Sequence, residues 1–200
     1  MDRISGVRTS ALDELSGPLN TRPLRRFALR VSVVALNAWR NRLSSGPEHR
    51  RATAKKIMGL ATRTANAAES DPAKAKIPQL WARFSTERWA ERLNEMGAVG
   101  PTMAVYSGYE SDVSGSYQLL VGRQVPNSPP VSAPLQVISI AQGPYLAFRC
   151  PGPLPDAIIG GWREVWKYFA RANAPARAYT SDFEIYPEAG PAEIWVAVQG

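Results

Sequence analysis

Histidine and cysteine are almost absent from this 200-residue chain, which contains one of each, His49 and Cys150. A single cysteine cannot form an internal disulfide framework. Zinc sites usually draw on several Cys or His ligands, and Ser-His or Cys-His dyads need a histidine beside the nucleophile. The composition therefore disfavours these chemistries, and we expect no metal or cofactor. The lack of cysteine pairs also fits a reducing compartment, so we expect a cytoplasmic protein.

Long hydrophobic runs are missing as well. The longest apolar stretch near the start, residues 27–36, is interrupted by Arg30 and Ser32. It is far shorter than the roughly 18 residues that a transmembrane helix requires. Arginines before a short apolar run resemble a signal peptide, but a charge breaks this run and it lies late in the chain. We therefore expect neither secretion nor a membrane partner.

Positive charge is concentrated at the start of the chain. Residues 1–56 contain twelve Lys/Arg and four Asp/Glu, whereas residues 57–200 contain twelve and thirteen. The break at Gly46 and Pro47 divides a basic extension, residues 1–50, from a domain at 55–200. Residues 23–43 have the pattern of a basic amphipathic helix, either a solvated or disordered appendage or a contact for nucleic acid or an anionic membrane. The extension is too short for a complete DNA-binding domain, and dimerisation through it stays open.

The hydrophobic pattern after residue 55 gives the order strand, helix, strand, strand twice. Asp71 followed by Pro72 is a helix-start signal, but Pro78 is awkward inside that helix, so the helix either begins near Ile77 or bends there. Gly160 and Gly161 weaken the second main helix by about 1 kcal/mol each relative to alanine. The expected elements are strand 56–64, helices ending near residues 84 and 96, strands 102–109, 116–125, 135–141 and 145–150, helix 153–173, and strands 181–186 and 192–198.

Four stretches within residues 55–200 occur in an informative order and with suitable spacing. They are residues 59–66 (GLATRTAN), 76–84 (KIPQLWARF), 109–122 (YESD, GSY and VG) and 181–198 (SDFEIYP and EIWVAV). Together they resemble the GyrI-like, or AraC effector-binding, domain family. This resemblance implies an α+β fold in which two pseudo-symmetric strand-helix-strand-strand units form a curved antiparallel sheet with two main helices and a central ligand channel.

Members of that family have several different functions. They include drug-sensing halves of transcription activators, stand-alone binders of lipophilic cations, gyrase inhibitors, and hydrolases of cyclopropane-bearing genotoxins. A stand-alone form, sometimes encoded on integron cassettes, is closest in length to this chain. The resemblance therefore implies a stand-alone module for lipophilic, cationic, drug-like molecules. A hydrolase that uses the same pocket and a gyrase-inhibitor-like protein are the alternatives, and we expect binding rather than turnover.

The family's buried, ligand-facing glutamate corresponds to Glu184. Side chains alternate along a strand, so Glu184 and Tyr186 share one face and Phe183 and Ile185 share the other. We expect Phe183 and Ile185 to pack on the second main helix, and Glu184 and Tyr186 to face the junction of the two units. Burying a carboxylate is costly unless it is paired, so a ligand cation is the expected partner. The alternative is an edge carboxylate in water or in a salt bridge.

Aromatic side chains are the other candidates for the site, because each adds about 0.5 to 2 kcal/mol of cation–π attraction. We expect Trp81 or Trp166, or both, to face the pocket, although aromatic residues at helical spacing are more often plain core. In the hydrolase alternative Glu184 activates water and Tyr106 donates a proton. The remaining candidates are Tyr106, Tyr145, Phe148, Tyr186 and Trp195.

Overall fold

The computed structural model describes residues 46–126 and 130–200. The segment at 23–43 and most of the expected extension lie outside these residues. The described elements, in chain order, are β1 Glu48–Ala52, β2 Lys55–Ala65, α2 Asn66–Glu69, α3 Ile77–Thr86, α4 Trp89–Glu95, β3 Val99–Ser107, β4 Ser116–Val125, β5 Leu135–Ile140, β6 Gly143–Cys150, α5 Asp156–Phe169, β7 Ser181–Tyr186 and β8 Ala192–Ala197.

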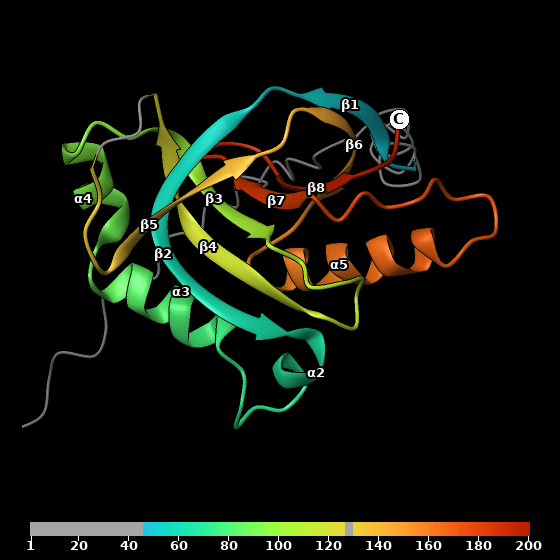
Figure 1. The fold of residues 1–200 in the computed structure, drawn as a ribbon, viewed down its shortest axis with the longest axis horizontal. Helices are drawn as coiled ribbons and strands as arrows, with labels where there is room; N and C mark the ends of the chain where they lie inside the picture. The colour runs from blue at the N-terminus through green and yellow to red at the C-terminus, as the bar shows by residue number, and fades with distance from the viewer. Residues whose placement is uncertain (1–45, 127–129) are drawn as a thin grey trace, which may run out of the picture. The chain divides into compact units, whose positions relative to one another are not determined.

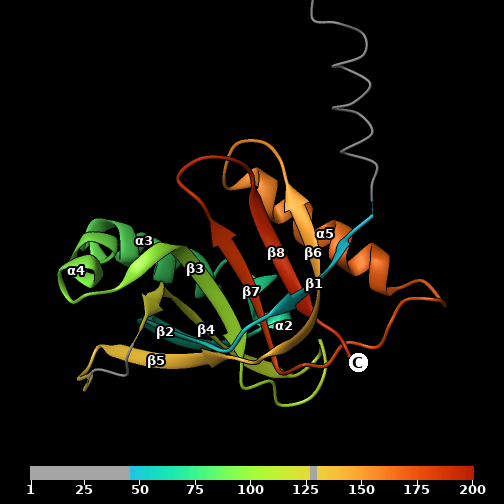
Figure 2. The same cartoon turned by 90° about the horizontal axis from the view of Figure 1, so that it is seen from above.

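The strands form one antiparallel sheet in the order β1-β6-β8-β7-β3-β4-β2-β5. Around the central β7–β3 pair the order is symmetric, since β6-β8-β7 on one side corresponds to β2-β4-β3 on the other. Along the chain, the helices lie between corresponding strands of the two triplets. Helix α5 lies between β6 and β7, and α3 and α4 lie between β2 and β3. Figure 2 shows α3 and α4 toward one end of the sheet and α5 toward the other. The predicted α+β fold with two repeated units is therefore confirmed.

The two edge strands are exchanged between the units. Strand β1 precedes β2 but pairs with β6, while β5 precedes β6 but pairs with β2. We did not predict β1, because residues 48–50 had been assigned to the extension. Its sequence, EHRRA, buries only Ala52, so it lacks the apolar alternation by which a strand is recognised.

Helix α3 begins at Ile77, the later of the two predicted starts, with Pro78 in its first turn. Proline fits there because the first helical N–H groups have no partner within the helix. The Glu69 carboxylate accepts hydrogen bonds from the backbone N–H groups of Lys76 at 3.0 Å and Ile77 at 3.1 Å. The start signal at Asp71 was misleading, because the acceptor that stabilises this helix end comes from the short helix α2.

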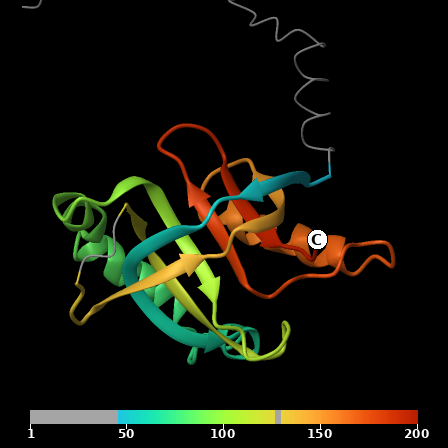
Figure 3. The same cartoon turned by 45° about the horizontal axis from the view of Figure 1, so that its top comes forward.

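Two close approaches of the backbone depend on glycine. A Cβ at Gly161 would lie 2.3 Å from the Cys150 sulfur and 2.8 Å from Ile194 Cδ1, so glycine lets α5 sit close to β6 and β8. Gly59 in β2 faces Gly122 in β4, and a Cβ on either would lie 2.0 Å from a carbonyl oxygen of the opposite strand. This contact lies on β2, which follows a pronounced arc in Figures 1 and 3.

Both faces of the sheet are buried. One face packs under α3 and α4 and, in the second unit, under α5. The other face has its own core, in which Phe183 stacks on Trp195 with ring centroids 5.3 Å apart. Our prediction that Phe183 and Ile185 pack on the helix was therefore wrong, because both contact the core on the opposite face. The predicted alternation of side chains along this strand was correct. Apolar residues alone cannot indicate which of two buried faces of the sheet they occupy.

Candidate ligand-binding site

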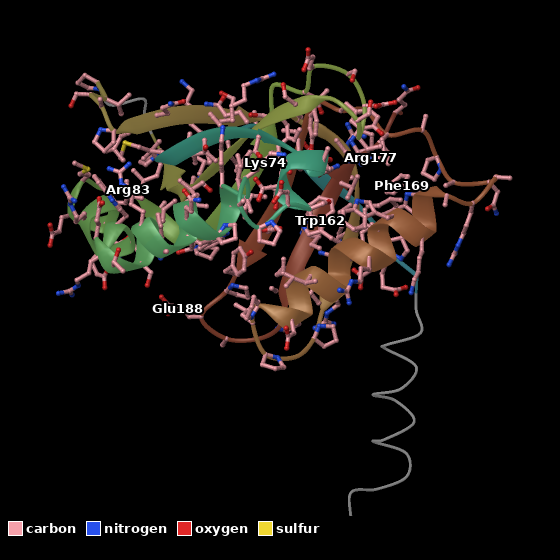
Figure 4. The ribbon with its side chains drawn as sticks, turned by 90° about the horizontal axis from the view of Figure 1, so that it is seen from below. Lys74, Arg83, Trp162, Phe169, Arg177 and Glu188 are labelled. Carbon is pink, nitrogen blue, oxygen red and sulfur yellow. The ribbon has the colours of Figure 1, made fainter. Side chains whose placement is uncertain are left out.

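A cavity of about 1250 Å³ lies between α3 and α5, over the central strands β3 and β7. Figure 4 shows α3 on the left and α5 on the right, with the labelled Trp162 in the region between them. The walls of the cavity are strongly aromatic, and few polar groups line it. The aromatic residues that line it are Trp81, Phe84, Tyr106, Tyr109, Tyr117, Trp162, Trp166 and Tyr186.

Glu184 contributes a carboxylate to the wall of this cavity, although only 1% of the residue is exposed. The residues directly beside it on the neighbouring strands are Ala104 on β3 and Ile194 on β8. Neither carries a polar side chain. The donors that reach the carboxylate therefore come from further away, from a diagonal position on β3, from β7 itself and from α5.

Three neutral groups donate hydrogen bonds to Glu184. Oε1 accepts from the Tyr106 hydroxyl at 2.8 Å and from the Trp162 indole N–H at 2.6 Å. Oε2 accepts from the Tyr186 hydroxyl at 2.5 Å. Within residues 46–126 and 130–200 no Lys, Arg or His forms an ion pair with this carboxylate. Glu184 is thus hydrogen-bonded without being neutralised.

Burial raises the pKa of Glu184, and the hydrogen bonds from Tyr186, Trp162 and Tyr106 oppose that rise. Burial, together with the nearby Glu184 charge, also raises the pKa values of Tyr106 and Tyr186. For Tyr117, further along the cavity wall, burial raises the pKa to about 12. These phenols therefore keep their protons near neutral pH and act as donors.

A second buried carboxylate, Asp182, lies two residues before Glu184 on the same face of β7. Its Oδ1 accepts from the Ala197 backbone N–H at 2.8 Å, and its Oδ2 accepts from the Tyr109 hydroxyl at 2.6 Å and from Arg177. Arg177 forms a salt bridge with Asp182, and its side chain is only 8% exposed. Its guanidinium lies 4.6 Å from the ring centroid of Tyr179. This carboxylate is therefore neutralised within the protein.

Five of the eight predicted site residues line the cavity, namely Glu184, Tyr106, Trp81, Trp166 and Tyr186. The other three lie elsewhere in the domain.

Tyr145 and Trp195 belong to the core on the opposite face of the sheet, where the Tyr145 hydroxyl donates to the Ala141 carbonyl at 2.8 Å. Phe148 lies on the helix side but packs against Tyr168 and Phe169, with ring centroids 5.6 Å and 6.4 Å away. Residue type alone could not exclude them, because their positions depend on strand register and on which face of the sheet lies under α5.

The sequence interpretation missed Trp162, Tyr109, Tyr117 and Arg177, which also line the cavity. Trp162 precedes Trp166 by four residues, so both lie on one face of α5. That spacing could have placed Trp162 in the site once Trp166 was proposed. Tyr109 and Arg177 reach the cavity through contacts distant in sequence, for which no local pattern exists.

In the part of the chain that the structure describes, no three His, Cys, Asp or Glu side chains are grouped so that they could hold a metal ion. None of the helices described at 46–126 and 130–200 is both long and apolar enough to span a lipid bilayer.

The repeated α+β units with an aromatic cavity where they meet define an effector-binding fold. The chain matches the Cass2 family, described as integron-associated effector binding protein, over residues 52–198. It belongs to that family, and residues 52–198 are therefore a small-molecule-binding module.

Similar proteins agree with this assignment. An integron cassette protein from Vibrio cholerae, VCH_CASS2, is 32% identical, with a TM-score of 0.64 over 78% of this chain and 97% of that one. A Bacillus subtilis (strain 168) protein, named "Putative transcriptional regulator protein YobU", is 28% identical over 72% of this chain and 92% of its own. SAV2435, solved bound to tetraphenylphosphonium, shares the fold at 20% identity, with a TM-score of 0.63 over 78% of this chain and 95% of its own.

Proposed function

We propose that residues 52–198 bind lipophilic, aromatic, cationic molecules, and that Glu184 supplies the opposite charge. One observation carries the proposal. Glu184 is a buried carboxylate in the wall of an aromatic cavity, and its three donors are neutral. Burying an ionised carboxylate without a counter-charge is costly. A cation that enters the cavity would remove this cost and would be attracted in return.

The rest of the cavity supports the same class of ligand. Trp81 comes from α3 and Trp162 and Trp166 come from α5, so indole rings lie on both sides of the site. Aromatic faces attract cations by about 0.5 to 2 kcal/mol per contact. Such walls impose few directional bonds, and a pocket of this kind tolerates many flat apolar bodies. We therefore infer that ligand charge, flatness and apolar area matter more than a particular pattern of polar groups.

A comparison of probes with one aromatic body tests the proposal on the wild-type chain. We expect (pyrenylmethyl)trimethylammonium to bind at least about tenfold more tightly than neutral pyrenemethanol near pH 7, a difference of about 1.4 kcal/mol. Tetraphenylphosphonium, chosen because SAV2435 shares this fold, should cause saturable quenching of tryptophan fluorescence, since three tryptophans line the cavity. Equal affinity for the pyrene cation and the pyrene alcohol would contradict the proposal.

A hydrolase is the second candidate, because the Tyr106 hydroxyl lies 2.8 Å from Glu184 Oε1 and burial raises the pKa of that carboxyl. Glu184 would take a proton from water, the water oxygen would bond to a strained ring carbon as the ring bond breaks, and Tyr106 would protonate the leaving atom. We place it second because Tyr106 directs its proton toward Glu184 in this arrangement.

Turnover separates the two candidates. The wild-type chain, Glu184→Gln and Tyr106→Phe should each be incubated with a cyclopropane-bearing alkylating agent, and the ring-opened alcohol quantified by mass spectrometry. Binding alone predicts the same background rate for all three proteins. Product that forms faster with wild type and is lost in both variants would move the hydrolase to first place.

A further inference from the structure

The two oxygens of the Glu184 carboxylate are unequally satisfied. Oε1 accepts two hydrogen bonds, from Tyr106 and Trp162, whereas Oε2 accepts one, from Tyr186. An ionised carboxylate offers about four lone-pair positions, two on each oxygen. No further donor from residues 46–126 or 130–200 reaches Oε2, so one of its two acceptor positions has no partner among the described residues, and Glu184 is part of the cavity wall.

Asp182, on the same face of β7, provides an internal template for such an oxygen. Its Oδ2 accepts one hydrogen bond from a phenol, Tyr109, and one from a cationic N–H group, Arg177. Arg177 also lies over the ring of Tyr179, 4.6 Å from its centroid. Oε2 of Glu184 has the phenol, Tyr186, and the aromatic surroundings, but within the described residues it has no cationic N–H group.

We propose that the preferred ligands are organic cations that carry an N–H group, such as protonated amines or amidinium ions, and that this N–H donates to Oε2 of Glu184 beside the Tyr186 hydroxyl. The inference rests on the proposed function and narrows its ligand class. A quaternary ammonium or phosphonium ion supplies the charge but has no hydrogen to donate. It leaves the available position on Oε2 unused.

Two physical effects compete in this discrimination. A hydrogen bond between a cationic N–H and a carboxylate is about twice as strong as a neutral one, which favours the N–H cation. A quaternary ion is less strongly hydrated and interacts equally well with aromatic faces, which favours the quaternary ion. The position left on Oε2 decides between them, because a buried acceptor can be satisfied only by a donor that the ligand brings.

Three probes that share one aromatic body isolate the hydrogen bond. They are (pyrenylmethyl)dimethylammonium, with one N–H, (pyrenylmethyl)trimethylammonium, with none, and neutral pyrenemethanol. Affinities are measured on the full chain near pH 7 by pyrene fluorescence. For the wild type we expect the dimethylammonium probe to bind at least about tenfold more tightly than the trimethylammonium probe. The trimethylammonium probe should in turn bind more tightly than the alcohol.

Two variants locate the discrimination at Oε2. In Glu184→Gln the difference between the two cations should shrink to less than about threefold, because an amide attracts an N–H cation far less than a carboxylate does. In Tyr186→Phe the carboxylate remains and Oε2 loses its neutral donor, so the difference should persist or increase. Retained binding of pyrenemethanol and a single cooperative thermal unfolding transition serve as folding controls for each variant.

Equal or tighter binding of the trimethylammonium probe to the wild type would overturn the inference. The proposed function would survive that result if both cations still bound more tightly than pyrenemethanol. If neither cation did so, the proposed function itself would fail. Loss of the discrimination in Tyr186→Phe alone would also overturn the inference, because it would assign the effect to the phenol instead of Oε2. A Glu184→Gln variant that failed to fold would leave the wild-type and Tyr186→Phe comparisons to decide.

Discussion

Asp182 and Glu184 lie two residues apart on the same face of β7, and both are almost completely buried. Each accepts three hydrogen bonds. One of the donors to Asp182 is the guanidinium of Arg177, whereas all three donors to Glu184 are neutral. Asp182 is therefore balanced by the protein itself and helps hold the fold together. Glu184 has no charged donor among the described residues, and it is Glu184 that lines the cavity, where we propose that a ligand cation balances it.

The largest expected difference between the two carboxylates concerns stability. In Asp182→Asn the amide N–H₂ replaces an acceptor and meets the donors Arg177 and Tyr109, so Arg177 loses its counter-charge inside the protein. Breaking a buried ion pair in this way costs about 3 to 5 kcal/mol. For a domain of this size the melting temperature should fall by on the order of 10 °C. Urea and thermal unfolding measure both quantities.

The same carboxylate-to-amide change at Glu184 is the matched control. In Glu184→Gln the new side chain can still accept from Tyr106 and Trp162 through its oxygen, and the Tyr186 hydroxyl can turn to accept from its amide. The cost of burying a charge disappears, so the free energy of unfolding should change by less than about 1 kcal/mol or rise. Equal destabilisation by Asp182→Asn and Glu184→Gln would mean that both carboxylates are structural, and the contrast between them would be lost.

A smaller effect is expected from the aromatic wall. Trp166 lines the cavity but is 50% exposed, so Trp166→Ala should leave the unfolding free energy nearly unchanged. The variant should bind (pyrenylmethyl)trimethylammonium more weakly by about 0.5 to 1 kcal/mol, a two- to fivefold loss of affinity, because one cation–π contact is removed. Trp195 packs on the other face of the sheet, so Trp195→Phe should leave the affinity for this probe unchanged. An equal loss of affinity in both variants would contradict the assignment of Trp166, and not Trp195, to the cavity wall.

The smallest expected effect is in the pH dependence of stability. Burial raises the pKa of Glu184 above its ordinary value of 4.5, so the folded state binds this proton more tightly than the unfolded chain does. Between the unfolded and folded pKa values the folded state therefore carries more protons, and its stability falls as pH rises through that window. Urea unfolding of wild type and Glu184→Gln between about pH 4 and pH 7 tests the sign. The wild type should lose stability relative to the variant with rising pH. A relative gain would indicate a lowered pKa.

Much of the fold could be predicted from sequence periodicity and order. The two strand-helix-strand-strand units followed from the apolar spacing, and alternation placed Glu184 and Tyr186 together on one face of β7. Strand β1 escaped prediction because its charged residues carry no apolar alternation. The face occupied by Phe183 was assigned wrongly because both faces of the sheet are buried, and a period of two residues does not distinguish between them.

The electrostatic difference between the two carboxylates was not predictable from their sequence context. Asp182 is neutralised by Arg177, from the segment between α5 and β7, and accepts a further hydrogen bond from Tyr109, which lies far earlier in the chain. Glu184 receives donors from β3, α5 and its own strand. These contacts depend on strand register and on the position of α5, which local patterns do not encode. The family resemblance singled out Glu184 without explaining why its neighbour has a different role.

The most direct test of the account is a calorimetric titration of wild type and Glu184→Gln with (pyrenylmethyl)trimethylammonium and with pyrenemethanol near neutral pH. If Glu184 supplies the counter-charge, the variant should bind the cation more weakly by about 1.5 to 3 kcal/mol, roughly ten- to a hundredfold. Its affinity for the neutral alcohol should change much less, because the amide oxygen of the glutamine can still accept a hydrogen bond from the hydroxyl. An equal loss for both probes, or no loss for the cation, would contradict the claim that the cavity selects its ligands through the unneutralised charge of Glu184.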